Sequence, residues 1–459
     1  MSSVLEKNLP NNWIIKDLEN ILTELISGSR PKGGVNGIEY GIPSIGGEHL
    51  DYNGNFNFEH VRFIPEKFYQ EMTKGHIQIN DILVVKDGAT TGKTSFVNQT
   101  FPFKKSAVNE HVFILRGIES IVFQPYLFRY LFSSVGQKII RSRITGSAQG
   151  GINTSFVRNF PIPLPPLNEQ KRIVVKIEEL FSLLESPIIE LEKSKILLAH
   201  YRHSLFHNLF EGNLNSKEIK FDIKKWKNVC YDDVSNRITY GFTNPMPDSN
   251  EGAWKITAVN IRNGKVNYEN ARKTDWKSFK SLLTDKSRPK VGTVVIIKDG
   301  ATIGRVGIID RENTCISQTV ASLEPNNEII SEFLAYSLQR PQIKQYIEKY
   351  KRATAIPHIS ITDLAKWKFL LPPINDQEKI IIFLKSNLSK IDNMKNLIEN
   401  SLFLLKKFKI KILKQAFEGK LVPQDPNDEP AEVLLQKIKQ EKEQLIQNQK
   451  TSRSTKNVK

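Results

Sequence analysis

The residues that most resemble a chemical site are two copies of one glycine-bounded motif. Lys86-Asp87-Gly88-Ala89-Thr90-Thr91-Gly92-Lys93 recurs 212 residues later as Lys298-Asp299-Gly300-Ala301-Thr302-Ile303-Gly304-Arg305. A glycine-rich loop that ends in lysine and threonine would bind the phosphates of a nucleotide. A Walker A loop has four residues between its glycines, but this motif has three. The second copy also carries Val306 in place of the Thr94 hydroxyl. The motif therefore argues against a nucleotide site.

The motif is better explained as a turn between two strands. Apolar and β-branched runs predict a strand before and after each copy, at Ile82–Lys86, Thr94–Val97, Thr293–Ile297 and Val306–Ile309. Glycine allows the positive φ angles that such turns need, and aspartate and threonine side chains bond the turn backbone. Each copy also ends in a basic residue, Lys93 or Arg305, which would suit a phosphate contact.

Motifs for other kinds of catalysis are missing from the sequence. There is no Gly-x-Gly fingerprint and no Asn/Asp-Pro-Pro-Tyr motif, so adenine methyl transfer has no visible site. Glu218-Ile219-Lys220 resembles the end of a nuclease motif, but its counterpart Asp425-Pro426-Asn427 does not keep it. The histidines are scattered. His358 could donate to DNA, although a structural role is expected. We predict no catalytic residue and no metal site.

The duplication extends over most of the chain. Leu164-Pro165-Pro166 recurs as Leu371-Pro372-Pro373, and Phe210-Glu211-Gly212 recurs as Phe417-Glu418-Gly419, both 207 residues later. A repeat of this length indicates a duplicated domain. The predicted class is mixed α/β with an internal pseudo-two-fold repeat. We expect globular domains at 1–166 and 213–373, long helices at 167–212 and 374–421, and a tail at 422–459 with a polar helix and a disordered end, Thr451–Lys459.

The two long helices carry matching heptad patterns. Apolar residues recur at intervals of three and four from Val174 to Leu205, and again 207 residues later. We expect the helices to pair as an antiparallel coiled coil, although each could instead pack on its own domain. Predicted N-caps are Asn168 and Asn375, with Glu169 and Asp376 in the first turns and Gly212 and Gly419 at the ends. Pro187 is expected to kink the first helix or remove a bond from it.

Charge and composition narrow the class of protein. The chain has 459 residues with a formal net charge of +17, of which +9 lies in residues 213–373. Charge spread over folded segments favours a nucleic-acid surface over a polybasic membrane anchor, although a lysine-rich solvated surface would look the same. Two cysteines, Cys230 and Cys315, exclude a disulfide scaffold. With no apolar run of membrane-spanning length and no signal peptide, we expect a cytoplasmic protein.

In their duplicated order, these motifs resemble the specificity subunits of type I restriction-modification enzymes. The matching residues include Leu9-Pro10-Asn11-Asn12-Trp13, both Lys-Asp-Gly-Ala-Thr turns, the loop Gly146–Asn153, the Leu-Pro-Pro and Phe-Glu-Gly motifs and the tail Gly419–Pro430. The segment Ala353–His358 departs from the resemblance, because it lacks the Gly and Gln of the first loop.

The resemblance implies a non-catalytic reader of double-stranded DNA. Each target-recognition domain would read one half of an asymmetric bipartite site, and the paired helices would set the spacing and dock two methyltransferase subunits. Restriction subunits would complete the complex. S-adenosylmethionine, ATP and Mg would act in those partners, with no cofactor in this chain.

Basic and polar residues near the repeated loops are the predicted DNA contacts. Arginine and glutamine read base edges, whereas lysine more often holds phosphate. The candidates are Arg30, Lys32, Lys86, Lys93, Arg143 and Gln149 in the first copy, and Arg262, Lys298, Arg305, Lys351 and Arg352 in the second.

Three other hypotheses for the function of the chain stay open. A nuclease or NTPase would act as an isolated chain. A basic coiled-coil scaffold would have no sequence-specific DNA binding, and the charge of its two variable domains would be incidental. The same reader could also serve a fused restriction-methylation enzyme of type IIB.

Overall fold

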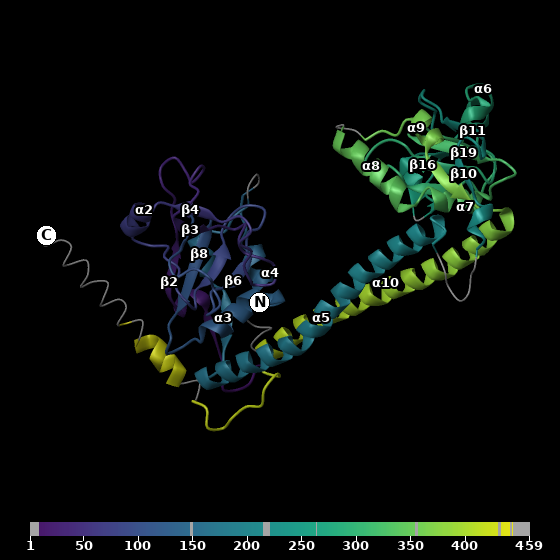
Figure 1. The fold of residues 1–459 in the computed structure, drawn as a ribbon. Helices are drawn as coiled ribbons and strands as arrows, with labels where there is room; N and C mark the ends of the chain where they lie inside the picture. Colours follow the sequence, from purple (N-terminus) through teal and green to yellow (C-terminus); the bar gives the residue numbers. More distant parts are fainter. Residues whose placement is uncertain are drawn as a thin grey trace. The chain divides into compact units, whose positions relative to one another are not determined.

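The computed structural model describes residues 9–146, 150–213, 221–262, 264–353, 357–429, 433–440 and 443. The chain forms two compact units (Figure 1). The first unit is Met1–Glu190 with Ser401–Lys459, and the second unit is Leu191–Asn400. Each unit therefore contains one end of each long helix. The predicted disordered end, Thr451–Lys459, lies outside the described residues.

The first unit is built on an antiparallel sheet of order β2-β8-β5-β6. Its strands are β2 (Leu22–Ser27), β5 (Ile82–Val85), β6 (Thr94–Phe96) and β8 (Val112–Gly117). A second sheet, β4-β3-β7, joins β3 (Ile42–Ile45), β4 (Arg62–Ile64) and β7 (Ala107–Val108), and β1 (Ile14–Asp17) pairs with β9 (Pro161–Leu164). The shorter helices are α2 (Glu66–Glu71), α3 (Gln124–Phe132) and α4 (Ser134–Ser142). All four residues of β5 are buried, as a central strand requires.

The second unit repeats this plan. The sheet β11-β19-β16-β17 joins β11 (Ser235–Tyr240), β16 (Val294–Ile297), β17 (Val306–Ile308) and β19 (Val320–Pro325). The sheet β15-β12-β18 joins β12 (Ala253–Ile256), β15 (Arg272–Thr274) and β18 (Thr314–Ile316). Two further pairs are β10 (Lys227–Cys230) with β20 (Lys368–Leu371) and β13 (Ile261–Arg262) with β14 (Lys265–Val266). Its shorter helices are α6 (Trp276–Ser281), α7 (Ser331–Ser337), α8 (Pro341–Ala353) and α9 (Ile361–Lys366). The predicted strands around both turns are confirmed.

The long helices α5 (Leu167–Phe210) and α10 (Ile374–Phe417) each have 44 residues and lie side by side (Figure 1). In the first unit, Lys409 lies over the ring of Phe181. In the second unit, the Tyr201 hydroxyl donates to Asn387 at 3.3 Å. As the residue number on α5 increases, the residue number of its partner on α10 decreases. The predicted antiparallel pairing is therefore confirmed.

The helix ends follow the sequence in part. Gly212 and Gly419 adopt φ of 71° and 69° two residues after the last helical residues, as predicted for C-terminal stops. The predicted N-caps are wrong, because Asn168 and Asn375 lie inside the first turns. The carbonyl of Pro166 already accepts the amide of Gln170 at 2.9 Å, so Pro166 takes the N-cap position and the helix begins at Leu167. Helix α5 continues through Pro187.

Candidate nucleic-acid interface

The two repeated turns occupy the same place in the two units. One joins β5 to β6 and the other joins β16 to β17, and both pairs are antiparallel. The turn glycines have positive φ, 93° and 88° at Gly88 and Gly92 and 91° and 85° at Gly300 and Gly304. The predicted strand-turn-strand is confirmed, and no helix follows the glycines as a P-loop requires.

A loop far away in sequence packs against each turn. In the first unit, the Gly88 amide donates to the Gly150 carbonyl at 3.2 Å, and the Ile152 amide donates to Lys86 at 2.7 Å. In the second unit, the Gly300 amide donates to Pro357 at 3.1 Å. The two loops are therefore equivalent, and each forms an isolated bridge with the turn aspartate, at Gly151 in one unit and His358 in the other.

An imidazole meets the aspartate of each turn. His111 Nδ1 lies 2.5 Å from Asp87 Oδ1, and His358 Nδ1 bonds Asp299 Oδ1. The lysine of each turn pairs with the same carboxylate, at 3.7 Å for Lys86 and 2.6 Å for Lys298. Two of the predicted DNA contacts are thus already paired with the turn. Sequence reasoning gave His111 no role, because the two histidines do not occupy equivalent positions and so leave no signal in the repeat.

Further charges extend this pair in the first unit. His111 Nε2 lies 3.3 Å from Glu110 Oε1, and the same oxygen lies 2.8 Å from Arg30 Nε. The Arg30 side chain is 60% exposed. The first turn is thus linked to an exposed guanidinium through two carboxylates and one imidazole.

The other predicted contacts differ in their surroundings. Arg30, Lys32, Arg262 and Arg305 are exposed. Lys93 is half-buried, with Nζ donating to the Leu50 carbonyl at 3.1 Å and lying over the ring of Tyr52. Arg143 is half-buried and donates to Asn159. Gln149 and the side chains of Lys351 and Arg352 lie outside the described residues. All eleven contacts stay predictions.

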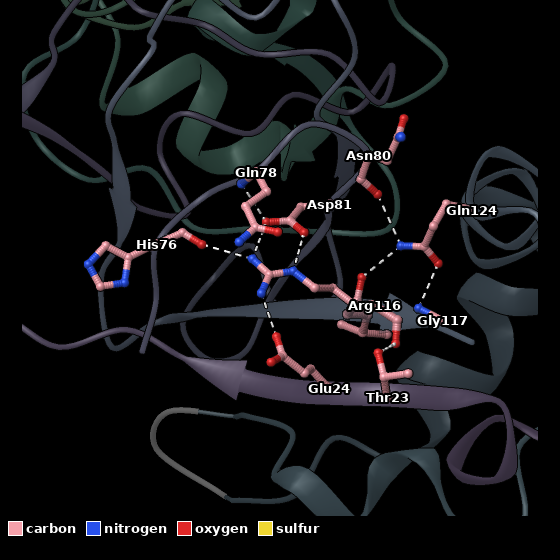
Figure 2. A network of polar contacts seen from close by, with 10 residues as sticks. Thr23, Glu24, His76, Gln78, Asn80, Asp81, Arg116, Gly117 and Gln124 are labelled. Carbon is pink, nitrogen blue, oxygen red and sulfur yellow. Dashed lines mark hydrogen bonds and ion pairs between the residues drawn. The ribbon is translucent and has the colours of Figure 1, made fainter. Parts of the chain in front are cut away.

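A buried ion pair fixes the strand that leads into the first turn (Figure 2). Asp81 precedes β5 and is 1% exposed, and it accepts from Arg116 Nε at 2.6 Å and Nη2 at 2.9 Å. Arg116 also donates to the His76 carbonyl and pairs with Glu24 on β2. Arg116 therefore joins β8 to β2 and to the segment that precedes β5, and its contact with Asp81 is bidentate. These bonds hold in place the strand that leads into the turn.

The helix pair exposes apolar side chains. In the second unit, Leu197 and Leu397 are each 66% exposed beside an apolar groove between the helices, whose other lining residues are Ser194, Leu198, Tyr201, Met394 and Ile398. In the first unit, Leu183 on α5 and Phe403, Leu404 and Phe408 on α10 are exposed. Patches of this kind commonly mark protein–protein contacts.

The described residues contain neither a membrane-spanning helix nor a metal cluster. No helix there is long and apolar enough to cross a membrane. No cluster of three or more His, Cys, Asp or Glu side chains suited to a metal ion occurs in the same part of the chain.

The sequence matches the family model described as "Type I restriction modification DNA specificity domain" twice, over residues 10–195 and 223–402. The chain belongs to this family. The two matches follow the internal repeat, so each unit of this specificity subunit contains most of one copy of the family domain.

Curated relatives in the family have low sequence identity to this chain but match it over most of its length. The chain is 22% identical to the type I restriction enzyme EcoKI specificity subunit of Escherichia coli K12, over 95% of this chain and 96% of that protein. It is 26% identical to the EcoBI specificity subunit of Escherichia coli, over 63% of this chain and 66% of that protein. It is 24% identical to the MjaVIII specificity subunit of Methanocaldococcus jannaschii, over 74% and 79%.

Solved structures share the fold. A chain from a structure of the type I R-M system matches with a TM-score of 0.70 at 17% identity, covering 90% of this chain and 99% of that one. The HsdS subunit from Thermoanaerobacter tengcongensis matches with a TM-score of 0.50 at 17% identity, covering 90% and 98%. The predicted fold class is confirmed: two similar mixed α/β domains and two long paired helices.

Proposed function

We propose that this chain is the DNA-reading subunit of a type I restriction-modification complex and acts in the cytoplasm. Each unit reads one half of an asymmetric bipartite site in double-stranded DNA, and the paired helices set the distance between the halves. The observation that carries the proposal is the duplication itself. Two copies of one scaffold, joined by paired helices, suit two half-sites at a set spacing.

The asymmetry of the site follows from the surfaces of the two units. The repeated turns share a backbone, but the groups around them differ. The first unit has Arg30, Glu110 and His111 beside its turn, whereas the second has His358 on the opposite loop. Because base edges are read by particular donors and acceptors, different side chains on one scaffold read different sequences.

The chain itself carries no catalysis in this proposal. Methyl transfer from S-adenosylmethionine and ATP- and Mg-dependent cleavage belong to two methyltransferase subunits and to the restriction subunits. The exposed apolar residues of α5 and α10 supply docking surfaces for the methyltransferases, since their burial in a complex would remove them from water.

The test is a selection of randomised duplex DNA by the chain co-purified with its methyltransferase subunits at physiological salt. We expect two short, unlike blocks separated by a fixed gap. A single contiguous block, or salt-sensitive binding with no preferred sequence, would contradict the proposal and favour a basic scaffold. A methyltransferase and nuclease fused in one partner chain would indicate the type IIB arrangement.

A further inference from the structure

We infer that the aspartate of each repeated turn anchors one hydrogen-bonding group toward DNA, directly in the second unit and through His111 and Glu110 in the first, and that the two units hold different groups. In the first unit the donor is the guanidinium of Arg30. In the second unit it is the imidazole of His358. This inference rests on the proposed DNA-reading function and names the groups that make its two halves differ.

The first support is that the two units reach the same aspartate–histidine pair from different positions. The Lys86 amide donates to the carbonyl of His111 at 2.8 Å, and the Lys298 amide donates to the carbonyl of Thr319 at 2.9 Å. His111 is therefore equivalent to Thr319. His358 is equivalent to Gly151, because both form the bridge to the turn aspartate. An imidazole is present at each turn, although neither histidine has a histidine at the equivalent position of the other unit.

The backbone explains why the first unit uses the other position. A Cβ atom at Gly151 would lie 3.0 Å from the Asp87 Cβ and 3.1 Å from the Lys86 carbonyl oxygen. Both contacts are tighter than ordinary van der Waals separation, and neither atom is the end of a flexible side chain. A histidine at Gly151 would therefore require the loop or the turn backbone to shift by a few tenths of an ångström, whereas the position before β8 needs no such shift.

The aspartate decides what the second unit offers to DNA. Its carboxylate accepts the Nδ1–H of His358 and lies beside Lys298, which balances its charge. Nδ1 is thereby bonded to the carboxylate, and Nε2 is the ring nitrogen left for DNA, where it would donate a hydrogen bond in the doubly protonated ring. The His358 side chain is 55% exposed, and in the described part of the chain its only ion-pair partner is Asp299. A single N–H donor suits a phosphate oxygen.

In the first unit the corresponding Nε2 is already used. It faces Glu110, which in turn holds Nε of Arg30 at 2.8 Å. This pairing takes one nitrogen of the guanidinium and orients its plane, while the side chain stays 60% exposed. The two terminal nitrogens can then bond the O6 and N7 atoms of guanine. The first unit thus holds a group for base reading where the second holds one for a phosphate.

Moving the histidine tests the anchor in the second unit. H358G should weaken binding of the selected duplex about ten- to a hundredfold, the range for one lost charged hydrogen bond. The loss should be uniform across sequences and reduce the salt dependence of binding. The double variant H358G/T319H places an imidazole at the position used by His111, and should recover most of the affinity. T319H alone is the matched control and should bind like the natural chain.

Removing Arg30 tests the first unit. R30A should relax the preference at one position of one half-site, and R30K should do the same because lysine lacks the planar fork. R62A is the control, since Arg62 is also 60% exposed and paired with a glutamate, Glu48. Unchanged binding by H358G, no recovery in H358G/T319H, or an unchanged base preference in R30A would overturn the inference. If the natural chain selected no preferred DNA sequence, that result would instead contradict the proposed function.

Discussion

The indole of Trp13 donates to the buried carboxylate of Glu169 at 3.0 Å, and the equivalent pair in the second unit is not made. Trp226 takes the place of Trp13 in the repeat, and Asp376 takes the place of Glu169. Asp376 is shorter by one methylene, and Nε1 of Trp226 is buried without a hydrogen-bond partner in the described part of the chain. One methylene thus separates a satisfied tryptophan from an unsatisfied one.

Substituting each acid by the other should change which of the two indole N–H groups has a hydrogen-bond partner. We expect D376E to raise the free energy of unfolding of the second unit by about 1 kcal/mol, because a longer acid can reach the indole. E169D should lower that of the first unit by about 1–3 kcal/mol, since it leaves a buried donor unpaired. Denaturant titration of both variants checks this. A D376E variant no more stable than the natural chain would show that Trp226 is satisfied in another way.

The tail should be held to the first unit by the pair Arg172–Asp428. The guanidinium contacts both carboxylate oxygens, at 3.1 and 2.5 Å, and the Asp428 side chain is only 4% exposed. A double-mutant cycle with R172A and D428A should give a coupling of about 1–2 kcal/mol. The exposed pair Lys176–Glu179 is the control and should give less than about 1 kcal/mol. Equal couplings for the two pairs would contradict a specific role in holding the tail.

The stability of the first turn of α6 should depend on pH in the acid range. The carboxylate of Asp275 accepts the backbone amide of Ser278 at 2.8 Å, and this bond lowers the pKa of Asp275 below 3.8. The unfolded chain then binds the proton at higher pH than the folded chain does. The stabilisation is therefore complete above pH 3.8 and is lost as pH falls through the folded pKa.

An NMR titration of the Asp275 carboxyl group measures this directly, together with hydrogen exchange of the α6 amides. D275N keeps an acceptor oxygen without a titrating group, so its α6 amides should not show this pH dependence. A pKa at or above 3.8 for Asp275 would refute the assignment of the cap.

The two cysteines should differ in reactivity. Cys315 is fully buried on β18, and burial raises the pKa of its thiol to about 12. At pH 8 only about one such thiol in ten thousand is ionised, and the thiolate is the reactive form. Cys230 is half-buried. Brief iodoacetamide treatment of the folded chain should modify Cys230 and leave Cys315 until denaturant is added, as read by mass spectrometry. Equal labelling of both would show that the second sheet opens readily.

Much of the fold could be predicted because its signals are local or periodic. Glycines at fixed places in the turns need positive φ, and the heptads of α5 and α10 predict a seam whatever the rest of the chain does. The N-caps were misplaced because the proline pairs offer an earlier start than Asn168 and Asn375, and local propensity alone does not choose between the two.

The candidate site shows the limit of prediction from sequence. Repetition of the motif marked Lys86 and Lys298 as candidate contacts, yet both pair with the turn aspartates. His111 carries no signal in the repeat and reaches Asp87 only because β8 lies beside β5.

The sequence by itself determined the duplication, the turns and the paired helices, since each depends on neighbouring residues or on a regular spacing. Only the tertiary structure decided which charges meet. The pairing of Asp87 with His111, of Asp299 with His358 and of Arg172 with Asp428 joins residues 24, 59 and 256 positions apart. Contacts of that kind depend on how the sheets and loops pack, and no pattern along the chain records them.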